Sequence, residues 1–147
     1  MKSISKNRKA LHEYTIVEKV EAGIVLKGSE VKALRMGQAN LADSYAVTRE
    51  GRAWLLNFSV SRLEHASYMN HAERRDKALL LHAKQIKKLD EATRQKGYTL
   101  IPLEIYFNDD NIVKIELALA KGKANHDKRQ SAKDADAKRE ARRAMRQ

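Results

Sequence analysis

Side chains that commonly carry out catalysis are present in this sequence, but they do not fall into a catalytic pattern. None of the five histidines stands in a His-Glu-x-x-His frame, which is the spacing of a helical zinc site. Asp109 and Asp110 lack the alternating oxygen ligands and the glycine of a calcium loop. We interpret His65 and His71 as ordinary loop histidines, because no cysteine is present to complete a metal site with them. The pattern predicts neither an enzyme nor a metal or cofactor site.

Two segments instead combine basic with aromatic residues, a pattern typical of RNA binding. The first contains Arg8, Lys9, His12 and Tyr14, and the second contains Lys121, Lys123, His126, Lys128 and Arg129. Lysine and arginine neutralise phosphates, and the rings of tyrosine and histidine stack on unpaired bases. His126 lies beyond the last predicted strand, so we expect it to be exposed. Tyr14 has an alternative role as a core residue, and both readings stay open.

The net charge supports a polyanionic partner. Residues 121–147 hold ten Lys and Arg against four Asp and Glu, which gives +6, so +5 of the total of +11 remains on residues 1–120. Nucleic acid fits better than a membrane surface, because this tail has no apolar face of Trp, Phe or Leu. A solvated extension that only aids solubility is the alternative.

The elements that position these residues form one domain followed by a tail. Val113, Ile115, Leu117 and Leu119 fall on one face and Lys114 and Glu116 on the other, which predicts a half-buried strand over residues 112–120. Residues 121–147 contain no Leu, Ile, Val or aromatic residue, so we expect them to be disordered alone and helix-prone on a partner. The lack of cysteine, of a targeting segment and of a long apolar run favours a cytoplasmic location.

In residues 1–60 the pattern predicts a basic N-terminal arm, strands and one helix. The arm covers residues 2–8, and strands are expected over residues 14–20 and 24–26 with a turn at Ala22-Gly23. A helix should begin at Ser29 and end before Gly37. A hairpin follows over residues 45–60, and its second strand should supply the centre of the core through Trp54, Leu56, Phe58 and Val60.

The remaining residues of the domain predict a loop, a helix and two strands. Residues 61–77 are polar and indicate a long loop, and residues 83–96 form an amphipathic helix with a basic face. A strand over residues 101–107 should place Ile101, Leu103, Ile105 and Phe107 on one face, and Pro102 should leave part of it unpaired. About six short antiparallel strands with two to three helices favour a mainly β fold, an OB-like closed β-barrel over residues 1–120.

The order and spacing of short motifs resemble the SsrA-binding protein (SmpB) family, the protein partners of transfer-messenger RNA (tmRNA). The resemblance runs nearly from end to end and is carried by Asn7-Arg8-Lys9-Ala10, His12-Glu13-Tyr14, Glu21-Ala22-Gly23, Gly28-Ser29-Glu30-Val31-Lys32, Leu34-Arg35, Gly37-Gln38-Ala39-Asn40, Asp43-Ser44-Tyr45, Leu79-Leu80-Leu81, Gly97-Tyr98, Lys121-Gly122-Lys123 and His126-Asp127-Lys128-Arg129. The chain departs from the family pattern at Ala78, Ala83 and Ala124, where a basic residue is usual, and at Ala144, where a larger aliphatic residue is common.

The resemblance implies an RNA-binding protein of trans-translation rather than an enzyme. Such a protein binds the tRNA-like domain of tmRNA and delivers it to stalled ribosomes, where incomplete peptides are tagged. Its direct partners would be tmRNA and the RNA of the small ribosomal subunit. The GTP-bound elongation factor and alanyl-tRNA synthetase would be partners only through the RNA, and the protein would be a monomer with no membrane partner and no cofactor.

The resemblance also implies two groups of site residues. RNA binding would involve Glu21, Leu80, Lys114, Lys121 and Lys123. The ribosomal decoding centre and messenger channel would receive Gly122, His126, Asp127, Lys128, Arg129, Lys133, Lys138, Arg139 and Met145. From the residues alone, Glu21 could equally accept backbone hydrogen bonds at a strand end, and Leu80 could be core.

Two other functions remain as alternatives. A general OB-fold RNA-binding or ribosome-associated factor would share the charge and the fold. An RNA-processing enzyme is disfavoured, because the sequence contains no convergent set of carboxylates or metal ligands.

Overall fold

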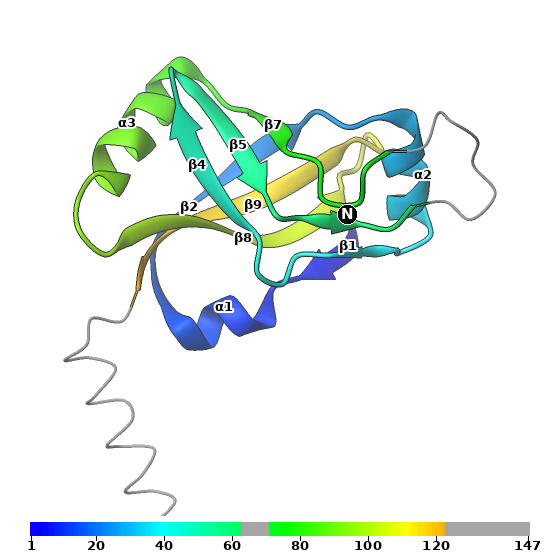
Figure 1. The fold of residues 1–147 in the computed structure, drawn as a ribbon, viewed down its shortest axis with the longest axis horizontal. Helices are drawn as coiled ribbons and strands as arrows, with labels where there is room; N and C mark the ends of the chain where they lie inside the picture. The colour runs from blue at the N-terminus through cyan, green and yellow to red at the C-terminus, as the bar shows by residue number, and fades with distance from the viewer. Residues whose placement is uncertain (63–70, 123–147) are drawn as a thin grey trace, which may run out of the picture.

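The computed structural model describes residues 1–62 and 71–122, and these residues form a mainly β structure with three helices (Figure 1). The strands are β1 (Lys2–Lys6), β2 (Tyr14–Ile24), β3 (Ala39–Asn40), β4 (Tyr45–Arg49), β5 (Arg52–Leu56), β6 (Ser59–Val60), β7 (Lys77–Leu80), β8 (Tyr98–Phe107) and β9 (Val113–Gly122). The helices are α1 (Arg8–Glu13), α2 (Gly28–Arg35) and α3 (Ala83–Thr93). No helix in this part of the chain is long and apolar enough to cross a membrane.

Antiparallel pairing joins the longer strands into a ring. The order β8-β4-β5-β7-β2-β9 closes because β9 also pairs with β8, and β1 joins the exposed edge of β8. The core lies inside this ring and contains, among others, Leu55, Phe58, Leu100, Ile105 and Leu117. Helices α2 and α3 lie at opposite ends of the ring, as Figure 1 shows. Helix α1 covers one part of the outer surface of this ring and leaves another part open.

The expected strand over residues 112–120 is confirmed as β9, with the four predicted apolar side chains buried. The helix expected after residue 28 is confirmed as α2, and Gly37 follows it with a φ of 70°, the left-handed conformation of a C-terminal cap. Its N-terminal cap is Lys27 rather than Ser29, because the Glu30 carboxylate accepts a 2.7 Å hydrogen bond from the Lys27 N–H. The amphipathic helix is confirmed as α3, which buries Ile86 and Leu89.

The predicted basic arm has regular secondary structure. Its first part is β1, which pairs with β8, and its end begins α1. Asn7 connects the two elements: its side chain donates to the carbonyl of Pro102 at 3.0 Å and accepts from the Ala10 N–H at 3.3 Å. Along this edge β8 pairs with β4 at Leu100 and with β1 from Glu104 onward, so Pro102 lies between the two pairings. The predicted unpaired stretch around the proline is therefore confirmed.

Two predicted core faces are confirmed only in part, because the strands concerned are irregular. In the hairpin, where Asn57 adopts a φ of 60°, the predicted Leu56, Phe58 and Val60 are buried, whereas Trp54 is only half-buried and Leu55 is buried in its place. In β8 the pairing with β9 shifts between Pro102 and Glu104. Ile101 and Leu103 consequently pack outside the ring, whereas Ile105 and Phe107 belong to the main core.

The expected turn at Ala22-Gly23 is also wrong, since β2 continues through both residues to Ile24. The predicted loop over residues 61–77 is partly outside the described residues, and its end contains the start of β7. Lys77 and His71 in this segment are buried, which a polar loop does not predict.

Candidate nucleic-acid interface

The outer surface of β8, β9 and β2 is covered at one end and open at the other. At the covered end, Ala10 of α1 packs against Ile101, Leu103, Ala118 and Ala120. Ala118 and Ala120 belong to β9, and their small side chains let α1 approach the sheet closely. Toward the other end of β9 the outward positions are Lys114 and Glu116, and both are only half-buried. The open end therefore presents larger polar side chains on a rigid sheet.

One line of paired residues crosses four strands at this open end. Tyr106 pairs with Lys114, Lys114 with Gly23, and Gly23 with Leu80. Neighbours in such a line lie about 5 Å apart. Leu80 is 59% exposed although it is a large apolar residue, and a Cβ built on Gly23 would lie 3.2 Å from its Cβ. The missing side chain at Gly23 thus leaves the room that Leu80 occupies.

A second line lies two residues away and carries three carboxylates. Glu104 pairs with Glu116, which pairs with Glu21. Lys19 lies 3.8 Å from Glu116, and Lys6 lies 4.0 Å from Glu104. The Glu21 carboxylate accepts a hydrogen bond from the hydroxyl of Tyr106. Sequence reasoning did not single out Tyr106, because its partner is 85 residues away in the chain.

The structure thus brings together three of the residues predicted to bind RNA: Glu21, Leu80 and Lys114. It does not bring Lys121 to them, because seven residues of extended strand separate Lys121 from Lys114, about 23 Å. Lys121 lies over the ring of Tyr98, with its Nζ 5.7 Å from the ring centre. The remaining predicted site residues lie outside the described residues: Lys123, His126, Asp127, Lys128, Arg129, Lys133, Lys138, Arg139 and Met145.

The end of the first basic and aromatic segment meets the start of the second at the far end of β9, where the described part of the chain ends. Tyr14 pairs with Gly122 in the antiparallel ladder. Beside them is a pocket of about 250 Å³ between α1 and the start of β4. Lys9 at its edge contacts Asp43 at 3.1 Å and Glu13 at 3.8 Å. Tyr14 is half-buried and packs against the outer apolar cluster, so it is partly a core residue.

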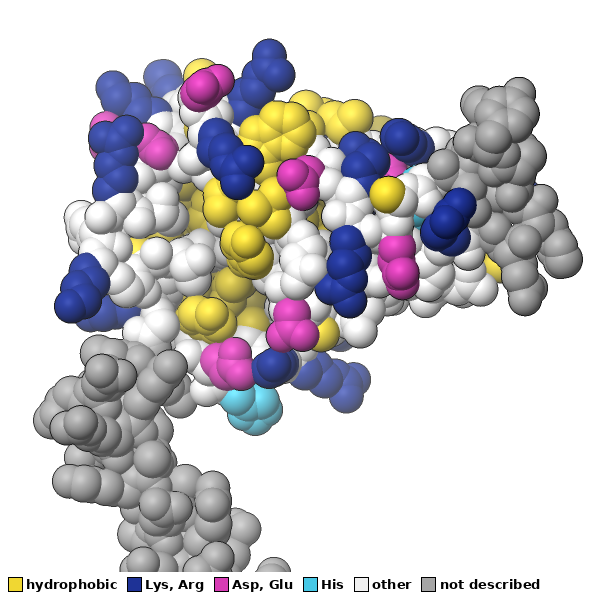
Figure 2. All heavy atoms as spheres, viewed as in Figure 1, with side chains coloured by type: hydrophobic (Ala, Val, Ile, Leu, Met, Phe, Trp, Pro, Cys, Tyr) yellow, Lys and Arg dark blue, Asp and Glu magenta, His cyan; other side chains and the backbone are white. Residues whose placement is uncertain are grey.

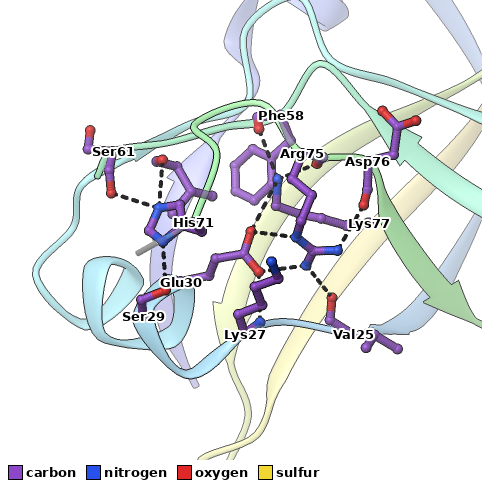
Figure 3. Close-up of polar contacts among 11 residues, drawn as sticks. Val25, Lys27, Ser29, Glu30, Phe58, Ser61, His71, Arg75, Asp76 and Lys77 are labelled. Carbon is purple, nitrogen blue, oxygen red and sulfur yellow. Dashed lines mark hydrogen bonds and ion pairs between the residues drawn. The ribbon is translucent and has the colours of Figure 1, made fainter. Parts of the chain in front are cut away.

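A buried polar network lies behind the open end of the sheet (Figure 3). Glu30 of α2 is fully buried and accepts a hydrogen bond from Arg75 at 2.6 Å. Its other oxygen lies 3.7 Å from the Nζ of Lys77, which is also fully buried and donates to the carbonyls of Phe58 and Arg75. Burial alone would raise the pKa of Glu30, but hydrogen bonds from Arg75 and from the Lys27 N–H, with the charge of Lys77, hold this pKa below its usual value.

His71 completes this network on the side of β6. Its Nε2 lies 3.0 Å from the carbonyls of both Val60 and Ser61, so this nitrogen donates, while Nδ1 accepts from the Ser29 hydroxyl at 2.8 Å. Together with Glu30, the histidine ties α2 and β6 to the residues that enter β7. Leu80 is at the end of β7, so the network helps to fix its position.

Basic side chains on helix α3 provide the predicted positive surface. Lys84, Lys87 and Lys88 are exposed, and Figure 2 shows several dark-blue side chains over the end of the molecule that carries α3. One of them, Lys88, makes a 2.8 Å ion pair with Glu18 of β2. The helix therefore places positive charge next to the sheet.

Comparisons with known proteins show which family this chain is similar to. The family model described as SmpB protein matches residues 4–147. An SsrA-binding protein of Rickettsia africae is 51% identical over 146 residues, 99% of this chain and 96% of the relative. One of Mycolicibacterium smegmatis is 52% identical over 139 residues, 95% of this chain and 86% of the relative.

A solved structure is similar as well. It is described by the words "tmRNA-SmpB: a journey to the center of the bacterial ribosome", and one of its chains is 44% identical to this protein. The TM-score is 0.68 over 82% of this chain and 84% of that chain. With a family match over nearly its whole length and relatives about half identical, this chain belongs to the SmpB family.

Proposed function

We propose that this protein binds the tRNA-like domain of tmRNA and delivers it to stalled ribosomes for trans-translation. The observation that carries this proposal is the family match over residues 4–147, joined to the line of residues that sets Lys114 and Leu80 beside Glu21. These side chains suit an unpaired RNA loop: Lys114 is a cation for phosphates, Leu80 is apolar, and the carboxylate of Glu21 accepts from N–H donors.

The ring of six strands is, in this proposal, an OB-like β-barrel that binds RNA on its outer surface. The pairing of β9 with both β2 and β8 supports this reading. The protein would act by binding rather than by catalysis and would work in the cytoplasm as a monomer. It would meet the GTP-bound elongation factor and alanyl-tRNA synthetase only through the RNA.

The basic tail would do the ribosomal part of the work. Gly122, His126, Asp127, Lys128 and Arg129 would contact the decoding centre, and Lys133, Lys138, Arg139 and Met145 would lie in the empty messenger channel. Lys121 and Lys123 would add phosphate contacts at the root of the tail. The net charge of +6 on residues 121–147 supports binding to ribosomal RNA.

Two measurements on the same proteins test the proposal. The first is the affinity for a transcript of the tRNA-like domain, compared with an ordinary tRNA, and the second is peptide tagging on stalled ribosomes. The full chain should bind the transcript in preference to tRNA. A chain cut after Gly122 should bind the transcript nearly as tightly but should not support tagging, and His126→Ala should lose part of the tagging.

Sequencing the RNA that copurifies with the full chain separates the proposal from its alternative. Enrichment of one tRNA-like species supports a tmRNA partner. Bulk ribosomal RNA without such a species would instead indicate a general ribosome-associated factor. Loss of transcript binding in the chain cut after Gly122 would contradict the division between sheet and tail.

A further inference from the structure

Tyr106 lies at the β8 end of the line of paired residues on the open sheet surface. It is only 6% exposed although it does not belong to the main core, and its hydroxyl donates to Oε2 of Glu21 across β9. Burial, and then the hydrogen bond and charge of Glu21, raise the pKa of the Tyr106 phenol well above its usual value. The phenol is protonated and donates at neutral pH, and the contact holds the Glu21 carboxylate in one orientation.

The Tyr106 phenol differs from the contacts of the neighbouring carboxylates, because it is a neutral donor. Glu116 and Glu104 each have a lysine within 4.0 Å, and Glu104 also accepts from the Ser3 hydroxyl at 2.6 Å. A lysine partner cancels charge, whereas a phenol orients a carboxylate and leaves its charge in place. Glu21 is exposed, so its second oxygen, Oε1, can accept from a bound molecule.

A charged carboxylate repels RNA phosphates, so its partners on RNA are ribose hydroxyls and N–H groups of the bases. Guanine offers two neighbouring donors on its Watson–Crick edge, N1–H and N2–H, and this edge is free only in an unpaired nucleotide. Leu80 is exposed on the next strand, where it can contact the face of a base, and Lys114 stands beside Glu21 for the phosphate. Glu21, Leu80 and Lys114 thus match the edge of a base, the face of a base and a phosphate.

Resting on the proposed function, we propose that Glu21 recognises the Watson–Crick edge of an unpaired guanine in the bound RNA, and that Tyr106 is the positioning residue that aims its carboxylate. Tyr106 itself does not touch the RNA. Its contribution passes through Glu21, and the two side chains are therefore energetically coupled in RNA binding.

A double-mutant cycle tests this coupling in the full chain with a transcript of the tRNA-like domain. Tyr106→Phe keeps the ring and removes the hydroxyl, and it should weaken binding about fivefold to tenfold, less than the full loss of a hydrogen bond to a charged group because Tyr106 acts only through Glu21. Glu21→Gln should weaken binding at least as much, and adding Tyr106→Phe to it should cost nothing further. The slope of affinity against salt should stay the same in all three variants, because no phosphate contact is removed.

The matched control is Tyr98→Phe, the same chemical change on the same strand at its far end. It should bind the transcript as the unaltered protein does. Urea unfolding of each variant shows whether the sheet remains folded. If Tyr106→Phe does not fold, the RNA side of the test still decides: inosine, which lacks the N2 amino group, replaces the unpaired guanosines one at a time.

One such inosine should weaken binding of the unaltered protein several-fold and leave binding of Glu21→Gln unchanged. Equal sensitivity of both proteins at every position, or no sensitivity at any, overturns the guanine assignment. Full affinity of Tyr106→Phe, or an added loss in the Glu21→Gln background, overturns the positioning role. Failure of the unaltered protein to bind the transcript would instead refute the proposed function, so the two failures are distinguishable.

Discussion

Removal of the Glu30 carboxylate should destabilise the protein far more than removal of an exposed one. Glu30 is fully buried and is the anionic centre for Arg75 and Lys77, at 2.6 Å and 3.7 Å. In Glu30→Gln the fully buried ammonium of Lys77 loses its nearby anion. Breaking a buried ion pair from one side costs about 3–5 kcal/mol, a large share of the ~5–15 kcal/mol that holds a small domain folded.

The matched control is Glu18→Gln, which breaks an ion pair with Lys88 at 2.8 Å. Both side chains of this pair are largely exposed, so the expected cost is ~0.2–1 kcal/mol. A third variant combines Glu30→Gln with Lys77→Met. Because the buried charge is then absent, this double variant should recover part of the stability lost in Glu30→Gln.

Urea unfolding followed by circular dichroism measures all three variants. The urea midpoint should be highest for Glu18→Gln, lower for the double variant and lowest for Glu30→Gln. The slope of the unfolding free energy against urea concentration should be the same for all three. A loss for Glu30→Gln within about 1 kcal/mol of the loss for Glu18→Gln, the upper end of exposed pairs, would refute the reasoning. It would mean that water or a shift of Arg75 compensates Lys77, and that the network does not fix the entry to β7.

Three further predictions concern pH, the sheet surface and the N-terminal helix. The folded pKa of Glu30 lies below its ordinary value, so the Glu30 carboxylate stabilises the fold above about pH 4.3 and this stabilisation is lost as the pH falls through the folded pKa. Urea unfolding between pH 7 and pH 3 should show this loss of stability. The Glu30→Gln variant should lose less stability over the same pH range. Lys114→Ala should weaken binding to the tRNA-like domain by about 1 kcal/mol and reduce the salt slope by about one ion if it contacts one phosphate; an unchanged slope in a titration over salt would remove Lys114 from the phosphate contacts. Asn7→Ala removes the N-cap of α1 and the donor to Pro102, and it should lower the unfolding free energy by about 1–2 kcal/mol in urea; stability equal to that of the unaltered chain would contradict the capping role.

The regular elements could be predicted from the sequence because each carries its own period. Residues 113–119 of β9 alternate without interruption, and Ile86 and Leu89 share one face of α3. The predictions failed where a single residue breaks the period. Asn57 at positive φ and the shifted pairing near Leu103 each reverse the face of the residues that follow. Neither irregularity has a glycine to announce it.

Contacts between distant segments could not be predicted from any local pattern. Glu30 fits the first turn of a helix by itself, and nothing nearby in sequence indicates that Arg75 and Lys77 pair with it. The same is true of Tyr106 and Glu21, which meet only because β9 lies between their strands. The resemblance to a family supplied Glu21, Leu80 and Lys114 as site residues, whereas the physical reason for their grouping required the register of four strands.

The outward residues of β9 encode how the sheet surface is divided. Lys114 and Glu116 are polar, whereas Ala118 and Ala120 are small and lie under α1. The helix can approach only where the side chains are small, so the surface near Lys114 stays open. From Lys114 to Gly122 an extended strand spans about 26 Å, more than twice the Debye length of ~8–10 Å at ordinary salt. Substitutions at the open surface should therefore leave the electrostatics at the root of the tail unchanged, and variants of the two ends can be combined to test whether their effects on RNA affinity and on tagging add independently.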